Sequence, residues 1–247
     1  MNVRFADCRY DLADPPAARR RYLAAHIPGA AFVDLDTELS DLSIPPETAG
    51  RHPLPGAEQF AAAMGRAGIG DDTLVVAYDE GMTGGAARLW WLLGHFGHDQ
   101  VAVLDGGLAS WIGLLASGEE EIEQATFTPR ERQGDTVTTE ELLGRLGEPG
   151  LVLLDGRPAD RFRGDAHGPD PVPGHIPGAL NTPSTTGRAV ELPPEAVDAD
   201  EVVAYCGSGV AACAVLLSLR RAGRTDARLY PGSWSEWSRK GLPAEKG

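Results

Sequence analysis

The sequence predicts an α/β protein of two tandem domains, each a parallel sheet flanked by helices. Short apolar runs of strand character alternate with helical patterns, and the same landmarks occur twice in the same order. Alternation of this kind favours a parallel sheet, because the crossover between two parallel strands usually carries a helix. A chain of 247 residues is long enough for two domains that each bury a core.

The elements follow one another in the same way in both halves. In the first half, helices are predicted at 57–67 and 86–96, and strands at 74–78 and 101–104. In the second half, strands predicted at 151–154, 202–205 and 228–230 surround a helix at 210–222.

An internal repeat is visible in four pairs of landmarks. The pairs, first copy before second, are His26–Ala30 with His175–Ala179, Asp7–Arg9 with Asp155–Arg157, Val75–Asp79 with Val202–Cys206, and Leu104–Gly107 with Tyr230–Ser233. Four landmarks in one order indicate a duplicated domain rather than one shared motif.

The domain boundaries are expected in the acidic and polar stretch between the two copies. We predict domains at 1–118 and 136–247, joined by a linker at 119–135. The linker prediction rests on composition, because this stretch starts with three glutamates and continues with mixed polar residues and Pro129.

Composition and charge limit the compartment and the partners. With 42% hydrophobic residues, 31 Gly and 19 Pro, the chain resembles an ordinary globular protein with many turns. Three cysteines are too few for a disulfide framework, and there is no signal-peptide pattern or bilayer-spanning run, so we expect a soluble cytoplasmic protein. The net charge of −14 argues against nucleic acid or an anionic membrane as partner, so any attraction for an anionic substrate must be local.

The candidate nucleophile is Cys206, at the predicted end of a strand and ahead of a helix. Backbone amides freed by Gly207, Ser208 and Gly209 can turn toward its sulfur, and the helix dipole adds positive potential. Both effects favour a thiolate. A cysteine at a strand end is often only a small buried hydrophobe, but glycines on both sides of a serine favour the chemical interpretation.

The other cysteines, Cys8 and Cys213, are interpreted as structural. The first copy has Asp79 at the position of Cys206, and a carboxylate cannot replace a thiolate as a sulfur nucleophile. Only the second domain is therefore expected to be catalytic.

The tandem domains, the His-Ile-Pro-Gly-Ala motif in each and the lone cysteine loop in the second resemble the two-domain rhodanese sulfurtransferases over nearly the whole chain. The loop from Cys206 to Val210 is more similar to the 3-mercaptopyruvate branch, whose loop typically reads Cys-Gly-Ser/Thr-Gly-Val-Thr. The thiosulfate branch typically carries Arg and Lys after the cysteine, and this loop has neither.

The resemblance implies a cofactor-free sulfur relay with double-displacement kinetics. Cys206 would take a sulfane sulfur from a small anionic donor, releasing pyruvate or sulfite, and pass it from a persulfide to cyanide, a small thiol or thioredoxin. Substrate contacts are expected from the loop and from one arginine of the second domain, namely Gly207, Gly209, Val210, Ala211 and Arg161. A guanidinium suits a carboxylate or sulfonate because it can bind two oxygens at once.

The resemblance also implies a relay of Ser208, His52 and Asp36, with the active site between the domains. Loss of sulfur from mercaptopyruvate leaves an enolate, which such a relay could protonate. The second domain would supply Ser208 and Arg161, and the first would supply His52 and Asp36.

Residues that occur in both copies are assigned mainly to structure, since only one copy holds the nucleophile. This group contains Arg157, which matches Arg9, and the pair His26 and His175. Two departures from the family pattern leave the donor open. Asp170 lies about where a second substrate-binding arginine is expected, and Ala211 replaces a threonine.

Two other functions are compatible with a cysteine loop in an α/β domain. Dual-specificity phosphatases also use a loop cysteine, but their phosphate-binding arginine is replaced here by Ala212. A non-enzymatic persulfide carrier or redox sensor remains an alternative, disfavoured by a proton relay that a carrier does not need. A pair of inactive domains conflicts with the intact cysteine loop. The histidines and cysteines show no spacing typical of a metal site. The glycine pairs Gly84–Gly85 and Gly106–Gly107 do not extend to a phosphate-binding loop pattern.

Overall fold

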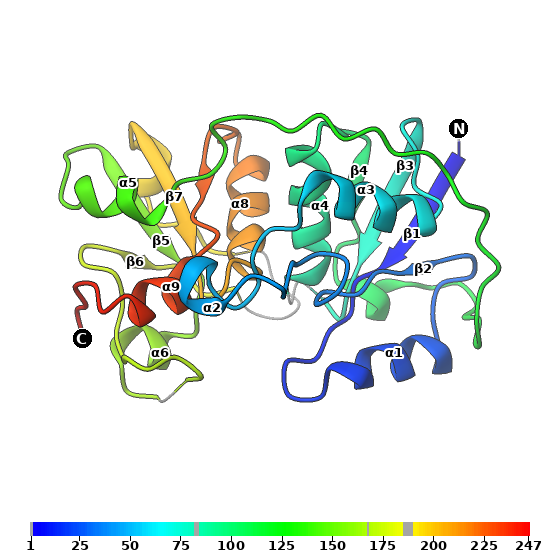
Figure 1. The fold of residues 1–247 in the computed structure, drawn as a ribbon, viewed down its shortest axis with the longest axis horizontal. Coiled ribbons are helices and arrows are strands. Elements are labelled where there is room, and N and C mark those ends of the chain that lie inside the picture. The colour runs from blue at the N-terminus through cyan, green and yellow to red at the C-terminus, as the bar shows by residue number, and fades with distance from the viewer. Residues whose placement is uncertain (1, 82–83, 167, 185–189) are drawn as a thin grey trace. The chain divides into compact units, whose positions relative to one another are not determined.

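The computed structural model describes residues 2–81, 84–166, 168–184 and 190–247 (Figure 1). The described chain divides into two compact units. Unit 1 consists of residues 2–41 and 54–132, and unit 2 consists of residues 42–53, 133–184 and 190–247.

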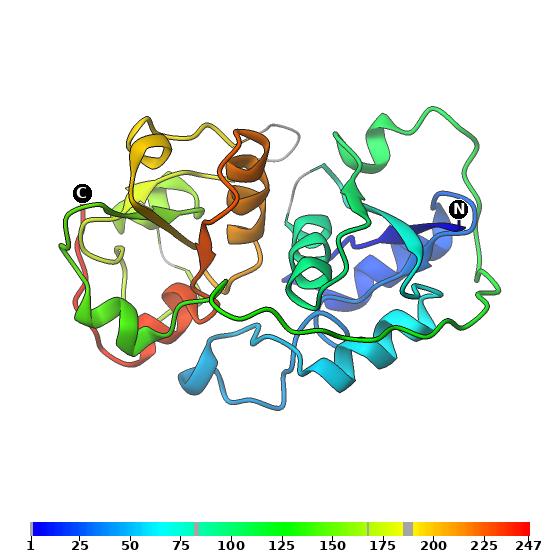
Figure 2. The same ribbon diagram turned by 90° about the horizontal axis from the view of Figure 1, so that it is seen from above.

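Unit 1 is a parallel four-stranded sheet with strand order β2-β1-β3-β4, flanked by helices (Figures 1 and 2). Its strands are β1 (Asn2–Asp7), β2 (Ala31–Phe32), β3 (Thr73–Tyr78) and β4 (Val101–Val103). Its helices are α1 (Pro15–Ala24), α3 (Ala57–Arg66), α4 (Gly85–His95) and the short 3-10 helix η1 (Gly107–Ser110). Helix α4 packs on β3 and β4, and most of its side chains are buried in the core of unit 1.

Unit 2 repeats this architecture with strand order β6-β5-β7-β8, again parallel throughout. Its strands are β5 (Leu151–Asp155), β6 (Leu180–Asn181), β7 (Glu201–Tyr205) and β8 (Arg228–Leu229). Its helices are α2 (Pro46–Ala49), α5 (Thr139–Gly144), α6 (Ala159–Arg163), α7 (Glu195–Asp198), α8 (Ala212–Arg221) and α9 (Ser233–Arg239). The core between the sheet and α9 includes the fully buried Trp234 and Trp237.

The predicted fold class is confirmed. The two sheets share one strand order and an equivalent register, with Asp7 opposite Tyr78 in unit 1 and Asp155 opposite Tyr205 in unit 2. Predicted strands and helices lie close to the observed ones. The main difference is that the helix expected at 210–222 begins only at Ala212. Val210 and Ala211 belong instead to a tighter turn, because their carbonyls accept the amides of Cys213 and Ala214, three residues later, rather than amides four residues later.

The repeated histidines hold their loops by the same contacts in both units. Nδ1 of His26 and Nδ1 of His175 each lie 2.8 Å from a backbone carbonyl oxygen. The following residue donates its amide N–H to a tyrosine hydroxyl, Tyr78 in unit 1 and Tyr205 in unit 2. Matching contacts in the unit with a catalytic candidate and the unit without one support a loop-anchoring role for both histidines.

Two segments are assigned differently from the expectation based on their place in the sequence: residues 119–132 belong to unit 1, and residues 42–53 belong to unit 2. Residues 119–132, expected as linker, lie along unit 1, where the amides of Ala125, Arg130 and Arg132 donate to backbone carbonyls of that unit. Residues 42–53 pack within unit 2, and their short helix α2 contacts α9. The second segment brings residues from the first repeat into the site described below.

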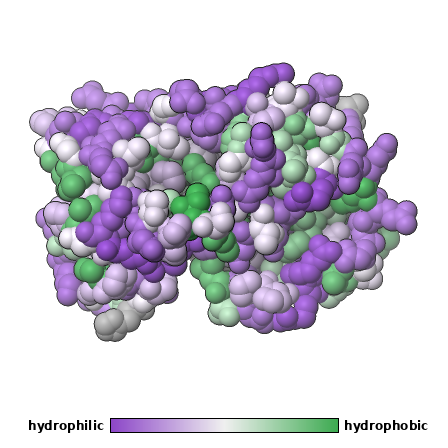
Figure 3. Space-filling view, in the orientation of Figure 1, coloured by the Kyte–Doolittle hydropathy of each residue, from purple (hydrophilic) through white to green (hydrophobic). Residues whose placement is uncertain are grey.

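The face drawn in Figure 3 is dominated by hydrophilic residues, with hydrophobic ones scattered among them. No helix in the described ranges is both long enough and apolar enough to cross a bilayer.

Candidate active site

Cys206 follows β7 directly and is 3% exposed. Its backbone is held by the start of α9, because its amide donates to Oγ of Ser233 at 3.1 Å and its carbonyl accepts the Trp234 amide at 2.9 Å. The next carbonyl, of Gly207, accepts the amide of Ser235 at 3.0 Å. The first turn of α9 therefore fixes the position from which the Cys206 side chain starts.

Ser233 adopts a backbone conformation that costs energy. Its φ is +53°, the only positive φ of a non-glycine among the described residues. Gly107, the matching residue of the first repeat, has φ +61°. A serine at a position that suits glycine is strained, and strain of this kind concentrates at functional sites. Here the hydroxyl accepts the Cys206 amide and donates to the Tyr230 carbonyl at 3.0 Å.

The loop after Cys206 ends at the N-terminus of α8. Gly209 turns the chain with its positive φ, and the thiol of Cys213 donates to the Gly209 carbonyl at 3.3 Å from within α8. Cys213 is fully buried, in agreement with its structural interpretation. The middle of the loop, Ser208 to Val210, is buried, whereas Gly207 and Ala211 are partly exposed to solvent.

Ser208 and His52 lie side by side in unit 2. Nδ1 of His52 is 2.7 Å from Oγ of Ser208, and the two side chains are 7% and 5% exposed. They are separated by 156 positions in the sequence, and the segment 42–53 carries His52 to the cysteine loop. A hydrogen bond between an imidazole and a hydroxyl, shielded from water, can move a proton.

Close backbone approach explains how His52 reaches this position. A Cβ at Gly50 would lie 2.4 Å from the Gly232 carbonyl oxygen, and Gly50 has φ +80°. Only glycine fits there without displacing α9. The next amide, of Arg51, donates to Oγ of Ser235 at 3.0 Å, so the segment is fixed on both sides of the turn before His52.

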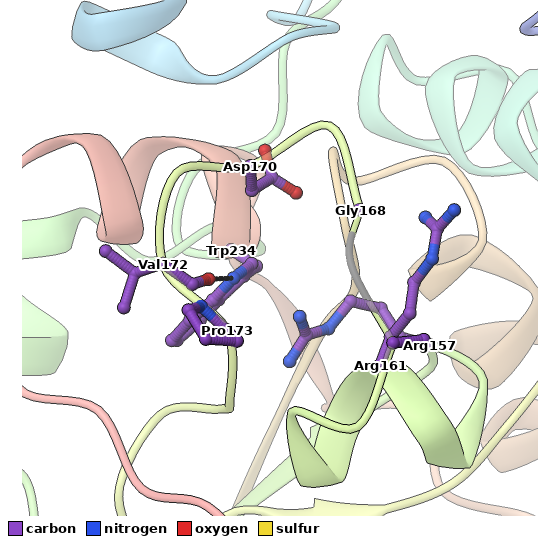
Figure 4. A pocket seen from close by; sticks show the side chains of 8 residues that line it. Arg157, Arg161, Gly168, Asp170, Val172, Pro173 and Trp234 are labelled. Carbon is purple, nitrogen blue, oxygen red and sulfur yellow. Dashed lines mark hydrogen bonds between the residues drawn. The ribbon is translucent and has the colours of Figure 1, made fainter.

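A small pocket lies next to α9 (Figure 4). It is lined by Arg157, Arg161, Ala166, Gly168, Asp170, Val172, Pro173 and Trp234. Figure 4 shows both arginine side chains and Asp170 around it, and the Trp234 indole, which donates to the Val172 carbonyl at 2.9 Å. The two guanidinium groups suit a small anion.

Arg157 is the structural arginine of the pocket. Its Nη2 lies 2.6 Å from Oδ2 of Asp155, and its guanidinium carbon lies 4.7 Å from the Trp234 ring centroid. Burial opposes the charge, but Asp155, with Tyr205 and Cys206, raises the pKa of Arg157 above its usual value. Arg9 and Asp7 repeat the pair in unit 1 at 2.6 Å, which supports the structural assignment.

Arg161 lies on α6 and faces the same pocket. Its backbone amide donates to Asp160, while within the described ranges its guanidinium has no ion pair. It is therefore the pocket arginine available to an incoming anion.

Asp36 belongs to unit 1. It is half-buried in the turn after β2, and its amide donates to Oδ1 of Asp34 at 3.0 Å. A small hollow lined by Tyr10, Asp34 and Asp36 adjoins it within that unit. Its assignment to the relay stays a prediction.

Asp79, the counterpart of Cys206, shows what the first-copy loop holds. Its carboxylate accepts the amides of Gly81 at 2.8 Å and of Gly84 and Ala86 at 3.2 Å each, the last two at the start of α4. Asp79 is 1% exposed. In unit 1, therefore, the backbone amides that follow β3 bind the carboxylate of the protein's own Asp79.

Sequence reasoning missed Arg51, Ser233, Trp234 and Arg239 as parts of the site. A signal existed for Ser233, since the matched landmarks set it against Gly107. Arg51 and Arg239 carry no such pattern, and their importance rests on ion pairs with Asp170.

Known protein families and relatives match this chain over both of its repeats. The family model for the rhodanese-like domain matches residues 2–114 and 138–240. A "Probable 3-mercaptopyruvate sulfurtransferase" of Pseudomonas aeruginosa is 43% identical over 249 residues, covering 94% of this chain and 87% of the relative. The human 3-mercaptopyruvate sulfurtransferase is 38% identical over 250 residues, covering 92% and 82%.

Solved structures give the same result. SseA from Escherichia coli, described as a 3-mercaptopyruvate sulfotransferase, is similar with a TM-score of 0.78 and 33% identity, covering 94% of this chain and 92% of that one. A structure described as a "Probable Thiosulfate Sulfurtransferase" is similar with a TM-score of 0.61 and 26% identity, covering 98% and 96%.

Proposed function

Because this chain belongs to the rhodanese family and carries two rhodanese-like domains, we propose that it moves a sulfane sulfur from a small anionic donor to a thiophilic acceptor through Cys206. Relatives named for 3-mercaptopyruvate and a solved structure named for thiosulfate support sulfurtransferase activity as the reaction class. They also weigh against a purely non-enzymatic carrier. The phosphatase alternative lacks its arginine, since Ala212 begins α8.

The first half-reaction transfers sulfur to the enzyme. The Cys206 thiolate attacks the donor sulfur and forms a new S–S bond. The bond that breaks is the C–S bond of 3-mercaptopyruvate, whose electron pair leaves as the enolate of pyruvate, or the S–S bond of thiosulfate, whose electron pair leaves on sulfite. The hydrogen of the mercaptopyruvate thiol stays on the outer sulfur of the persulfide and leaves from there as a proton. The enolate takes one proton to become pyruvate, whereas sulfite needs none.

The second half-reaction regenerates the enzyme. An acceptor nucleophile attacks the outer sulfur of the Cys206 persulfide, and the electron pair of the broken S–S bond returns to Cys206 as thiolate. Cyanide, a small thiol and thioredoxin are the proposed acceptors, because each supplies a nucleophile that bonds readily to sulfur. No cofactor takes part in either half-reaction.

The observation that carries the proposal is the hydrogen bond between His52 and Ser208, two residues beyond Cys206 in the loop. We assign this pair to delivery of the proton that the enolate needs, with Asp36 as the proposed third member. A proton relay is useful for mercaptopyruvate and idle for thiosulfate. We therefore propose 3-mercaptopyruvate as the preferred donor.

Donor binding is assigned to the pocket and the loop together. Arg161 would hold the carboxylate or sulfonate through two oxygens. Gly207, Gly209, Val210 and Ala211 would surround the sulfur with backbone amides, in the way that the first-copy loop surrounds the Asp79 carboxylate. In the described part of the chain, Cys8, Cys206 and Cys213 form no disulfide, which suits a reducing compartment, and we propose a cytoplasmic location.

The test is a comparison of kcat/KM for 3-mercaptopyruvate and thiosulfate with cyanide as acceptor, on the wild type and on Cys206→Ser. Cys8→Ser is the matched control, since Cys8 is equally buried but lies in unit 1. We expect Cys206→Ser to lose transfer from both donors and Cys8→Ser to keep it. Retained transfer in Cys206→Ser would refute the mechanism. Uptake of one sulfur per chain without turnover would favour the carrier alternative.

A further inference from the structure

Asp170 is a buried acid in a pocket that otherwise attracts anions. Its side chain is 7% exposed, and it is the one acidic residue among the described residues that line the pocket. Its Oδ1 accepts hydrogen bonds from Nη1 of Arg51 and, at 3.0 Å, from Nη1 of Arg239. One carboxylate is therefore shared by two guanidinium groups (Figure 4 shows Asp170 at the pocket).

Both arginines belong to elements that build the active site. Arg51 precedes His52, and its Nη2 would lie 3.0 Å from a Cβ at Gly207, so its guanidinium is beside the cysteine loop. Arg239 closes α9, whose first turn binds the Cys206 backbone. The Asp170 carboxylate, which lines the pocket, therefore binds one arginine beside the cysteine loop and one at the end of α9, the helix that holds the loop backbone.

The charges around the pocket do not cancel. Arg157 is neutralised by Asp155, whereas Arg161 has no ion pair within the described ranges. Arg51 and Arg239 share the single negative charge of Asp170. The balance is thus positive, and Asp170 lowers it by one unit of charge at the place where a donor anion would be held.

We propose that Asp170 is a specificity-determining residue that makes the pocket favour a donor with one negative charge over a donor with two. The inference rests on the proposed function. Near pH 7 most 3-mercaptopyruvate carries its charge on one carboxylate, since an ordinary thiol titrates at a pKa of about 8.5, whereas thiosulfate carries two charges on one small group. Repulsion by a nearby carboxylate grows with the charge of the donor.

Asp170→Asn is the direct test, because asparagine keeps the volume and one oxygen acceptor for the arginines and removes only the charge. For a donor about 10 Å away in a partly buried site, the extra charge of the dianion corresponds to roughly a tenfold effect. We expect the ratio of kcat/KM for thiosulfate to kcat/KM for 3-mercaptopyruvate to rise about tenfold at pH 7.

A second variant separates charge from damage to the fold. Arg239→Gln removes one positive charge from the same ion-pair group, so the ratio should fall, opposite to the change in Asp170→Asn. Asp165→Asn is the matched control on the same connection, since Asp165 pairs with Arg163, is 62% exposed and does not line the pocket. General loosening of the site would lower both rates together in both variants.

An unchanged donor ratio in Asp170→Asn, or a change of the same sign in both variants, would overturn the inference. Absence of turnover with either donor in the wild type would instead overturn the proposed function. In that case, isothermal titration of the wild type and of Asp170→Asn with sulfate and with acetate still measures whether the pocket selects by charge. The affinity for sulfate relative to that for acetate should rise about tenfold in Asp170→Asn. The same sulfate-to-acetate ratio in both proteins would refute the role of Asp170.

Discussion

Replacement of His52 by alanine separates the proton relay from the sulfur-transfer step. The imidazole is 7% exposed and lies 2.7 Å from Oγ of Ser208. The variant leaves Cys206 and Arg161 in place, so a donor that needs no proton should still react. We expect kcat/KM to fall much further with 3-mercaptopyruvate than with thiosulfate.

The size of the effect follows from the chemistry. A positioned general acid contributes roughly 10²- to 10⁴-fold, or about 3 to 5 kcal/mol of barrier, which is the expected loss with 3-mercaptopyruvate. With thiosulfate we expect a change within about threefold. Stability should also fall, because Ser208 Oγ is 5% exposed and loses its partner, at a cost of about 1 to 3 kcal/mol.

The assay is steady-state release of pyruvate or sulfite at several pH values, with thermal unfolding measured on the same samples. His98→Ala is the matched control, because His98 is 6% exposed in unit 1 and its imidazole Nε2 lies 2.9 Å from the Thr73 carbonyl oxygen. It should lose stability but show no donor-specific loss of rate. Equal loss with both donors in His52→Ala would refute the relay.

Three further predictions concern strain, pH and the first-copy loop. Ser233→Gly relieves a positive φ but leaves the Cys206 amide without its acceptor, so stability should change by less than about 1 kcal/mol while kcat falls, as denaturation and rate measurements would show. Arg145 lowers the pKa of Glu201. The pair thus stabilises the fold above about pH 4.3, and the effect is lost as the pH falls through the folded pKa. Glu201→Gln should therefore cost about 1 kcal/mol in urea unfolding at pH 7, and the difference should disappear in acid; a constant difference would contradict it. Asp79→Asn removes an anion held by three amides, so it should cost about 2 kcal/mol without altering donor kcat/KM, and a changed donor ratio would count against its purely structural role.

Much of the fold could be predicted from local pattern. The apolar runs that became β3, β5 and β7 are short and bounded by turns, and the helical patterns before and after them lie close to α3, α4 and α8. Such patterns act over a few residues, so a single sequence is enough to find them. The duplication indicated that both halves share one fold, whereas the strands β1, β2 and β6 and the helices α1, α5, α6 and α9 were not predicted.

The late start of α8 could not be predicted from hydrophobicity. Val210 and Ala211 continue an apolar run, but Gly209 takes a positive φ and the loop turns before the helix begins. The hydrogen bonds of this first turn, rather than the apolar pattern around it, set the boundary.

The sequence by itself determined the duplicated α/β architecture and pointed to the cysteine loop, since both depend on residues that are neighbours along the chain. Only the tertiary structure decided that His52, written in the first repeat, packs in the same unit as Ser208, and that Asp170 holds Arg51 and Arg239. These contacts join residues that are 69, 119 and 156 positions apart in the sequence. They depend on the close approach of Gly50 to α9 and on shared ion pairs, which no local pattern encodes.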